Sequence, residues 1–485
     1  MYEHTWESVR THDVPVWFRD AKLGVFIHWG LYSVPAWAPR VPDSAQAMRE
    51  HGAGGMFRAN PYSEWYMNSA RVEGNPPRQH HRDTYGPDFD YRAFAEEFDR
   101  ATAIADLDAL ASTLRGAGAE YVVLTTKHHD GFTLWPTGVP HPRHASHQAK
   151  RDLVGEFTAA VRRGGMRMGL YYSGGYDWSV NDAVMSRGSD AILAIPTDGY
   201  TEYAAAHVRE LIERYEPSVL WNDIAWPGGG DLAALIADYY NAVADGLIND
   251  RWAESPAKIG WLARRMLRVT DGVARRFWKH MPQRMKELDF SGAAHADFTT
   301  PEYRSFDEIQ PKPWEQTRGI GNSFAYNQHE DPADLLSITA LVRDFVDTVS
   351  KNGNLLLGVG PRADGTIPEE QLAVLAGLGD WMRVNREAII GTRPWHRADA
   401  ATAEGVDVRF TTSGDALYAL LVTTPTVREL TLPVSSGADM RVELLGHAPL
   451  DAKTTGTGTR ILLPEMLPVS PVHALRISGV IQPEA

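Results

Sequence analysis

The chain has 485 residues, 43% hydrophobic and 23% charged, which allows a large buried core and favours two domains, a barrel and a smaller accessory domain. Its formal net charge of -14 argues against a nucleic-acid partner, because phosphate contacts need a surplus of Lys and Arg. The sequence contains no cysteine, which excludes disulfides, thiolate zinc sites and cysteine nucleophiles.

The first 18 residues are charged and aromatic and contain no apolar stretch long enough for a secretory signal or a membrane span. We therefore expect a cytoplasmic location and no membrane partner. The 15 tryptophans suit either a sugar site, where aromatic rings stack on the C–H faces of a pyranose, or ordinary core packing.

Short β-rich runs alternate with amphipathic helical patterns over the first three quarters of the chain. Helical spacing is clearest at 151–165, 202–215 and 332–353. This alternation predicts an α/β fold with a (β/α)8-like, TIM-type barrel, whose working residues lie at the C-terminal ends of the strands. The eight expected strands are 23–29, 121–129, 167–173, 218–224, 246–252, 295–300, 322–327 and 354–360.

Two segments depart from the barrel rhythm. Residues 253–296 form a long insertion with basic and apolar residues at helical spacing, which predicts a helical excursion that is a solvated face, a lid or a subunit contact. After residue 395 short alternating strands predict a small antiparallel β-sandwich. We therefore divide the chain into a catalytic domain, 1–395, and a C-terminal domain, 396–485, that stabilises the barrel or binds carbohydrate.

Two carboxylates suit glycoside hydrolysis, which needs one group to attack or activate water and one to protonate the leaving oxygen. Asp223 ends the apolar strand at 218–224, where a charge is costly unless it is functional or paired, although it could simply cap the next loop. Glu302 follows a proline that stiffens its turn, and it could equally be an ordinary exposed glutamate.

Histidines also gather at the expected strand ends. His128 and His129 are adjacent on the strand at 121–129, so we expect them to point to opposite faces and to bind hydroxyls rather than one shared metal ion. A metal site would need further ligands such as His28 and Asp130, and we expect none. His28 alone also fits a buried core histidine.

A set of motifs resembles the alpha-L-fucosidases of glycoside hydrolase family 29. The motifs occur in the order found in that family over roughly residues 1–395, and the full set is highly specific. They are FIHWGLYSVPAW (26–37), EWYMN (64–68), KHHDGFTLW (127–135), YYSGGYDW (171–178), LWNDIAWP (220–227), NDRW (249–252), DFTTPEY (297–303), GIGNSFAYN (319–327) and SKNGNLLLGVGPRADGTIP (350–368).

The resemblance implies a retaining exo-glycosidase that releases alpha-L-fucose by double displacement. Asp223, beside Arg251, falls on the family nucleophile and Glu302 on the acid/base. The family's sugar-pocket positions fall on His28, Glu64, Trp65, His128, His129, Tyr171, Trp221, Arg251 and Phe324. Trp65, Trp221 and Phe324 would pack around the C6 methyl group of the deoxy sugar. No cofactor or metal is implied.

Two departures from the family pattern concern the site. Gly358 stands where the family commonly has Asn. The 253–296 insertion directly precedes the block that contains Glu302, so Glu254 and Glu287 stay as alternative acids.

The expected partner is a fucosylated oligosaccharide or glycoconjugate, with an aglycone that the sequence does not specify. A glycosidase for another sugar, such as a galactoside or an arabinoside, and a non-catalytic fucose-binding protein are the competing hypotheses. Enzymes of this kind are commonly homo-oligomers, so a homo-oligomer is the assembly to test for.

Overall fold

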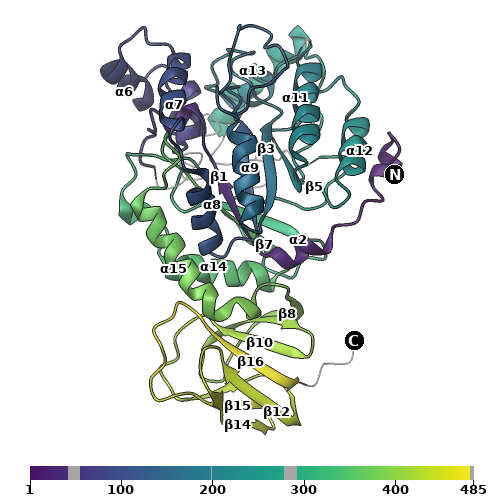
Figure 1. Cartoon of the computed structure of the whole chain (residues 1–485), viewed down its shortest axis with the longest axis vertical. Helices are drawn as coiled ribbons and strands as arrows, with labels where there is room; N and C mark the ends of the chain where they lie inside the picture. Colours follow the sequence, from purple (N-terminus) through teal and green to yellow (C-terminus); the bar gives the residue numbers. More distant parts are fainter. Residues whose placement is uncertain (42–54, 198, 278–291, 481–485) are drawn as a thin grey trace.

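A curled parallel sheet forms the larger part of the molecule (Figure 1). The computed structural model describes residues 1–41, 55–197, 199–277 and 292–480. The strands of this sheet are β1 (Leu23–Ile27), β2 (Tyr121–Lys127), β3 (Arg167–Ser173), β4 (Val219–Asp223), β5 (Leu247–Ile248), β6 (Trp314–Gly319) and β7 (Gly353–Val359). Their order is β5-β4-β3-β2-β1-β7-β6, and every pair is parallel. The expected α/β barrel-like architecture is confirmed.

Residues 297–303 lie between the two edge strands of this sheet. The Asp297 N–H donates to the Ile248 carbonyl of β5, and the Glu315 N–H of β6 donates to the Thr299 carbonyl. Parallel bridges also pair Thr299 with Trp314 and Glu302 with Thr317. This irregular segment therefore takes the eighth position of the barrel and places Glu302 at its rim.

Two of the eight predicted strands are wrong. Residues 295–300 hold the eighth position without forming a regular strand, and residues 322–327 are a loop. The strand that was missed, β6, reads WEQTRG. It was not predicted because most of its residues are polar, whereas a buried strand is normally recognised by an apolar run. The strand expected at 246–252 is regular only at Leu247–Ile248.

Helices surround the sheet, and the apolar core between the two layers includes Leu124, Phe157, Leu211 and Phe345. The helical patterns at 151–165 and 202–215 are confirmed, whereas the third pattern begins late, because the Ser337 side chain caps a helix that starts at Ile338. The helices are α1 (Trp6–Val9), α2 (Val16–Ala21), α4 (Gly55–Arg58), α5 (Tyr66–Ser69), α6 (Pro76–Tyr85), α7 (Phe94–Thr102), α8 (Leu107–Gly116), α9 (Leu153–Arg163), α10 (Asp190–Leu193), α11 (Tyr200–Tyr215), α12 (Leu232–Ala242), α13 (Trp261–Phe277), α14 (Ile338–Ser350) and α15 (Glu369–Asn385).

A second core fills the inside of the barrel below the rim. Alternate residues of each strand point inward, so Val219, Trp221 and Asp223 of β4 share one face. Val219 and Trp221 pack there with Phe26, Tyr171 and Leu356 from other strands of the barrel. Asp223 thus stands above this packed inner core.

The C-terminal region is an antiparallel β-sandwich, as expected. Its core contains Val408, Phe410, Leu432 and Ile461. One sheet has the order β13-β12-β16-β10-β9-β8 and the other β11-β15-β14. The strands are β8 (Arg393–Ala401), β9 (Asp407–Ser413), β10 (Ala416–Leu421), β11 (Glu429–Leu432), β12 (Ser436–Leu444), β13 (Pro449–Leu450), β14 (Ala452–Thr455), β15 (Gly458–Leu462) and β16 (His473–Val480).

Helices α14 and α15 lie between the barrel and the sandwich (Figure 1). The Trp381 indole of α15 donates to the Val472 carbonyl, and Asp347 of α14 pairs with Arg409 of β9 at 2.6 Å. Tyr418 and Leu420 of the sandwich belong to the core of the barrel helices. The two regions therefore share one continuous apolar contact.

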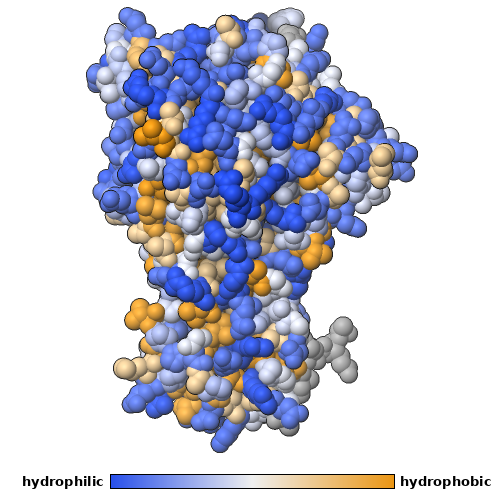
Figure 2. Space-filling model, viewed as in Figure 1, coloured by the Kyte–Doolittle hydropathy of each residue, from blue (hydrophilic) through white to orange (hydrophobic). Residues whose placement is uncertain are grey.

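The predicted helical insertion contains α13, and residues 278–291, with Glu287, lie outside the described residues. Helix α13 exposes Trp261, Leu262, Met266 and Val269. Hydrophilic residues cover most of the barrel face shown in Figure 2, with hydrophobic residues scattered among them. Among the described residues, no helix combines the length and apolar character that a membrane crossing needs.

Candidate active site

Asp223, the last residue of β4, is buried and receives hydrogen bonds at both oxygens. The Tyr171 hydroxyl donates to Oδ2 at 2.8 Å, and Arg251 and the Ile224 N–H each donate to Oδ1 at 2.9 Å. The guanidinium of Arg251 also lies over the Trp221 ring, 4.7 Å from the ring centre. These contacts hold the carboxylate in one orientation at the barrel rim.

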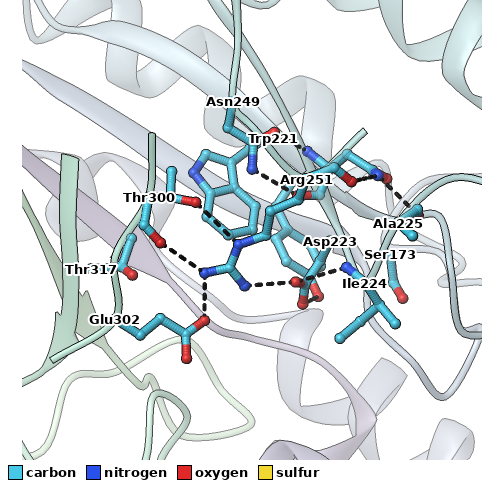
Figure 3. Close-up of polar contacts among 12 residues, drawn as sticks. Ser173, Trp221, Asp223, Ile224, Ala225, Asn249, Arg251, Thr300, Glu302 and Thr317 are labelled. Atoms are coloured by element: carbon cyan, nitrogen blue, oxygen red, sulfur yellow. Dashed lines mark hydrogen bonds and ion pairs between the residues drawn. The ribbon is translucent and has the colours of Figure 1, made fainter. Parts of the chain in front are cut away.

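Arg251 joins the two predicted carboxylates through one guanidinium group (Figure 3). Its Nη1 contacts Asp223 at 2.9 Å, and its Nη2 contacts Glu302 Oε1 at 2.6 Å. Burial would lower the pKa of Arg251, but the charges of Glu302, Asp223 and Asp250 raise it above its usual value. The structure therefore brings an acidic pair and a permanent cation together at the mouth of the barrel.

Side-chain amides extend the short strand β5 far enough to position Arg251. Asn249 accepts from the Asn222 N–H and donates to the Asn222 carbonyl, which continues the ladder between β4 and the chain after β5. The Asn222 side chain also donates to the Arg251 carbonyl at 2.6 Å. The amide pair replaces the backbone pairing that a longer strand would supply.

Thr300 fixes the guanidinium from the other side. Its hydroxyl accepts from Arg251 Nε at 3.1 Å and donates to Asp250 Oδ1 at 2.6 Å, while its carbonyl accepts from Nη2. Because Thr300 is two residues before Glu302, the same segment orients both partners of the Arg251–Glu302 ion pair.

The backbone is strained directly after each carboxylate. Ile224 and Ala225, which follow Asp223, have φ angles of 66° and 84°, and Tyr303, which follows Glu302, has a φ of 50°. A β-branched residue such as Ile224 strongly disfavours this left-handed region, and each such residue costs about 1–3 kcal/mol. Strain at both positions is typical of a site where side-chain placement matters more than stability.

Three buried histidines line the same region. Burial and its neighbour His129 lower the pKa of His28 to about 3, and burial holds the pKa values of His128 and His129 well below the usual range. The Nδ1 atoms of His28 and His128 are buried without a partner among the described residues. These neutral rings offer hydrogen-bonding atoms of the kind that sugar hydroxyls use.

The expectation that His128 and His129 point to opposite faces was wrong. Strand β2 ends at Lys127, so strand alternation no longer applies, and the two rings lie only 4.0 Å apart. The Tyr171 ring stacks on His128 at 5.5 Å, and His129 Nε2 lies 3.8 Å from Asp223 Oδ2. Both histidines therefore belong to one site.

The remaining predicted residues join the site in two groups. Phe324 packs on His28 at 5.0 Å, and Trp221 stacks on Tyr171 at 5.5 Å. Trp65 instead packs edge-on against His129 at 5.1 Å, within a separate cluster that includes Trp178. The structure thus places Trp65 on the His129 side of the site, away from the other two aromatic residues.

Glu64 is fully buried behind the loop that carries Phe324. Its Oε2 accepts from the Ser323 hydroxyl and from the Ala325 N–H, each at 3.1 Å. Burial raises the pKa of Glu64 to about 7 in spite of these hydrogen bonds. The carboxyl group thereby ties the 319–327 loop to the barrel rim.

Two residues of the site, Phe26 and Ser173, were not predicted from the sequence. Phe26 lies 5.1 Å from Trp221 and 6.4 Å from Phe324, and so connects their rings. The Ser173 hydroxyl lies 2.7 Å from His129 Nδ1. Each is two positions along its strand from a predicted residue, Phe26 from His28 and Ser173 from Tyr171, so the period of a strand could have identified both.

Glu254, the described alternative acid, lies apart from the Arg251 contacts. Glu254, proposed as an alternative acid, lies in a backbone bridge with Trp226, and its pKa is raised by burial and by Asp231. Arg251 contacts Glu302 and not Glu254 among the described residues. This arrangement favours Glu302 over Glu254 as the partner of Asp223.

A group that could hold a metal ion, His12, His295 and Asp297, lies at the β5 edge. Its carboxylate already accepts from the His12 ring, from the Tyr240 hydroxyl and from the Ile248 N–H, each at 2.8 Å. These hydrogen bonds give the cluster a structural role in anchoring the eighth barrel position.

Comparison with known proteins agrees with the motif pattern. A family model described as alpha-L-fucosidase matches residues 1–387. The chain is 30% identical to plasma alpha-L-fucosidase of Rattus norvegicus over 92% of this chain and 86% of that protein. It is also 30% identical to an alpha-L-fucosidase of Branchiostoma floridae, over 99% and 96%. The crystal structure of Thermotoga maritima alpha-fucosidase in complex with a mechanism-based inhibitor superimposes with a TM-score of 0.82, at 38% identity, over 99% of this chain and 100% of that chain.

Proposed function

The chain belongs to the alpha-L-fucosidase family, and we propose that it releases terminal alpha-L-fucose from fucosylated oligosaccharides or glycoconjugates with retention of configuration. The observation that carries this proposal is the single guanidinium of Arg251 between Asp223 and Glu302 at the barrel rim. Retaining glycosidases need two carboxyl groups on either side of the anomeric carbon, one as nucleophile and one as acid/base.

In the first step Asp223 acts as the nucleophile. Its carboxylate forms a bond to the anomeric carbon while the bond to the aglycone oxygen breaks, and Glu302 gives its proton to that oxygen. The hydrogen bonds from Tyr171 and Ile224 fix the carboxylate for attack before substrate binds. This preorganisation lowers the cost of aligning the nucleophile.

In the second step Glu302 removes a proton from water, the water oxygen bonds to the anomeric carbon, and Asp223 leaves. Two inversions restore the starting configuration. A protonated carboxyl group cannot keep the ion pair with Arg251, so the 2.6 Å contact must loosen whenever Glu302 carries the proton. Arg251 then remains available to stabilise Asp223 as a leaving carboxylate.

We assign recognition of the sugar to the neutral histidines and Glu64, which would hold the ring hydroxyls. For the C6 methyl group we assign the wall made by Trp221 and Phe324, with Phe26 connecting them. A deoxy sugar needs an apolar wall where other hexoses carry a hydroxyl group. Trp65, which packs against His129, would face another part of the ring.

Azide rescue tests the reaction and both roles together. Wild type, Asp223→Ala and Glu302→Ala are assayed with 4-nitrophenyl alpha-L-fucoside, with and without azide, and the products are examined by NMR. We expect Asp223→Ala to lose at least about 10⁴-fold in kcat. Azide should give alpha-fucosyl azide with Glu302→Ala, after two displacements, and beta-fucosyl azide with Asp223→Ala, after one.

Each competing hypothesis has its own outcome in this experiment. An inactive wild type that hydrolyses an aryl galactoside or arabinoside would replace the fucose assignment. A wild type that binds fucose but hydrolyses no glycoside would be a sugar-binding protein. Swapped azide products would exchange the roles of Asp223 and Glu302.

A further inference from the structure

Ser173 connects the predicted site to a backbone carbonyl that can only accept a hydrogen bond. Its hydroxyl lies 2.9 Å from the Tyr176 carbonyl oxygen and 2.7 Å from His129 Nδ1. A serine hydroxyl has one hydrogen, and the carbonyl contact requires it. The serine oxygen must therefore accept from His129, which places a hydrogen on Nδ1.

The other ring nitrogen of His129 then carries a free lone pair. Burial, with Lys127 and Arg251 nearby, lowers the pKa of His129 well below its usual range, so the ring is neutral and has one N–H. Nε2 lies 3.8 Å from Asp223 Oδ2, beyond hydrogen-bond distance, and that oxygen already accepts from Tyr171. Nε2 is thus an acceptor beside the predicted nucleophile.

Aromatic rings prevent the imidazole from exchanging its two nitrogen positions. Trp65, Tyr176 and Trp178 surround His129 edge-on, at 5.1, 5.2 and 5.4 Å between ring centres. The Trp178 N–H donates to the His129 carbonyl at 2.8 Å. The ring is therefore held with Nδ1 toward Ser173 and Nε2 toward Asp223.

We propose that Ser173 is a positioning residue, which holds His129 in the Nδ1–H tautomer so that Nε2 accepts a hydrogen bond from the sugar hydroxyl next to the anomeric carbon. This inference rests on the proposed function. Asp223 attacks the anomeric carbon, so the hydroxyl within reach of an atom beside Asp223 is the 2-hydroxyl. A hydroxyl that donates to Nε2 becomes richer in electrons and stabilises the positive charge that develops on the ring in the transition state.

A cycle of variants and substrates tests the proposal. Ser173→Ala, Ser173→Thr and wild type are assayed with an aryl alpha-L-fucoside and with its 2-deoxy analogue. We expect Ser173→Ala to lower kcat/KM about tenfold with the fucoside, the size of one lost hydrogen bond, and to change it little with the analogue. Ser173→Thr keeps the hydroxyl and should recover most of the loss.

Thr126→Val is the matched control. Thr126 is buried in β2, and its hydroxyl donates to the Tyr171 carbonyl at 2.7 Å without touching a histidine. Its removal should affect both substrates equally. If Ser173→Ala also lowered kcat/KM by the same factor with both substrates, Ser173 would be only structural and the proposal would fail.

Nitrogen-15 NMR of the imidazoles gives a reading that does not depend on activity. The His129 signals are assigned by their loss in His129→Gln. We expect a protonated Nδ1 and a bare Nε2 in wild type, and a shift toward the other tautomer in Ser173→Ala. A protonated Nε2 in active wild type would overturn the proposal alone, whereas the expected tautomer in a protein that hydrolyses no fucoside would overturn the proposed function.

Discussion

The two halves of the barrel rim hold their carboxylates by different means. On the β1–β4 side, regular parallel ladders lead to Asp223, whose position is fixed by the backbone register of β4. On the side between β5 and β6, the irregular segment 297–303 pairs with its neighbours only at isolated bridges, and side-chain contacts of Arg251, Thr300 and Asp297 help to hold it. A continuous backbone ladder positions one carboxylate, whereas isolated bridges together with side-chain contacts position the other, so we expect the second to be easier to displace.

The largest expected effect comes from the residue that joins the two halves. Arg251→Lys keeps the positive charge but cannot contact Asp223 and Glu302 with two separate nitrogens and Thr300 with a third. We expect kcat/KM on an aryl alpha-L-fucoside to fall about 1000-fold, because preorganised charges contribute on this scale.

Arg318→Lys is the control for this substitution, since Arg318 of β6 pairs with Asp344 of α14 at 2.6 Å. It should cost less than about 1 kcal/mol of stability and leave kcat/KM nearly unchanged. Equal losses of activity in the two variants would show that Arg251 has no special part in joining the carboxylates.

A substitution confined to the irregular half should lower the free energy of unfolding. Asp297→Asn keeps one acceptor but loses the charge that His12, Tyr240 and the Ile248 N–H contact. We expect the free energy of unfolding, measured with urea at pH 7, to fall by about 3 kcal/mol. Asp108→Asn, which removes a surface pair with Arg163, should cost no more than about 0.5 kcal/mol.

The Asp297 effect should depend on pH in a defined direction. Burial alone would raise the pKa of Asp297, but hydrogen bonds from His12 and His295, with the Ile248 N–H, lower it below its usual value. A carboxylate with a lowered folded pKa stabilises the protein above the unfolded pKa of about 3.9, and the stabilisation is lost as pH falls through the folded value. The difference between wild type and Asp297→Asn should therefore shrink as the pH falls below about 3.9 and through the lowered folded pKa. A difference that grew on acidification would contradict this account.

A smaller effect is expected where β7 meets Phe324, part of the proposed wall for the C6 methyl group. A Cβ atom at Gly358 of β7 would lie 2.8 Å from the Phe324 ring, so Gly358→Ala must displace that ring. We expect KM for an aryl alpha-L-fucoside to rise about tenfold, which corresponds to about 1.4 kcal/mol. Gly116→Ala, at the end of α8, meets nothing within 4 Å and should leave KM unchanged.

The smallest effect is expected for the exposed face of α13. Trp261 and Met266 are 73% and 62% exposed, so replacing both with serine should change the free energy of unfolding by less than about 0.5 kcal/mol. Size-exclusion chromatography with light scattering should give one mass for both proteins if this face is simply solvated. A change of mass would make α13 a subunit contact.

The sequence allowed a close prediction of the regular half of the barrel. Apolar runs marked β1 to β4 and β7, and Asp223, His28 and Tyr171 each stand at or near a strand end where a polar residue is conspicuous. The motif resemblance added Glu64 and Trp65, which lie in a single-turn 3-10 helix, and Phe324, which lies on a loop; no periodicity identifies any of them. Phe26 and Ser173 followed the same alternation and were overlooked.

The irregular half could not be predicted in the same way. Strand β6 reads as polar because Glu315 faces inward, where the Tyr121 hydroxyl and the Trp221 indole donate to it. Residues 295–300 hold a strand's position through isolated bridges, which leave no pattern in a sequence. His128 and His129 were misplaced because the end of β2 is set by tertiary contacts rather than by composition.

The carboxylate of Asp347 links the barrel to the sandwich, so it matters for any shortened form of the protein. It binds Lys351, the residue after α14, as well as Arg409 of the sandwich at 2.6 Å and the hydroxyl of Ser305, three residues beyond Glu302. A chain cut after the barrel would lose Arg409 and expose the α14 and α15 surfaces that Tyr418 and Leu420 cover. The sandwich therefore supports the segment that carries Glu302, the proposed acid/base, and we expect its removal to loosen that part of the barrel rim from a distance.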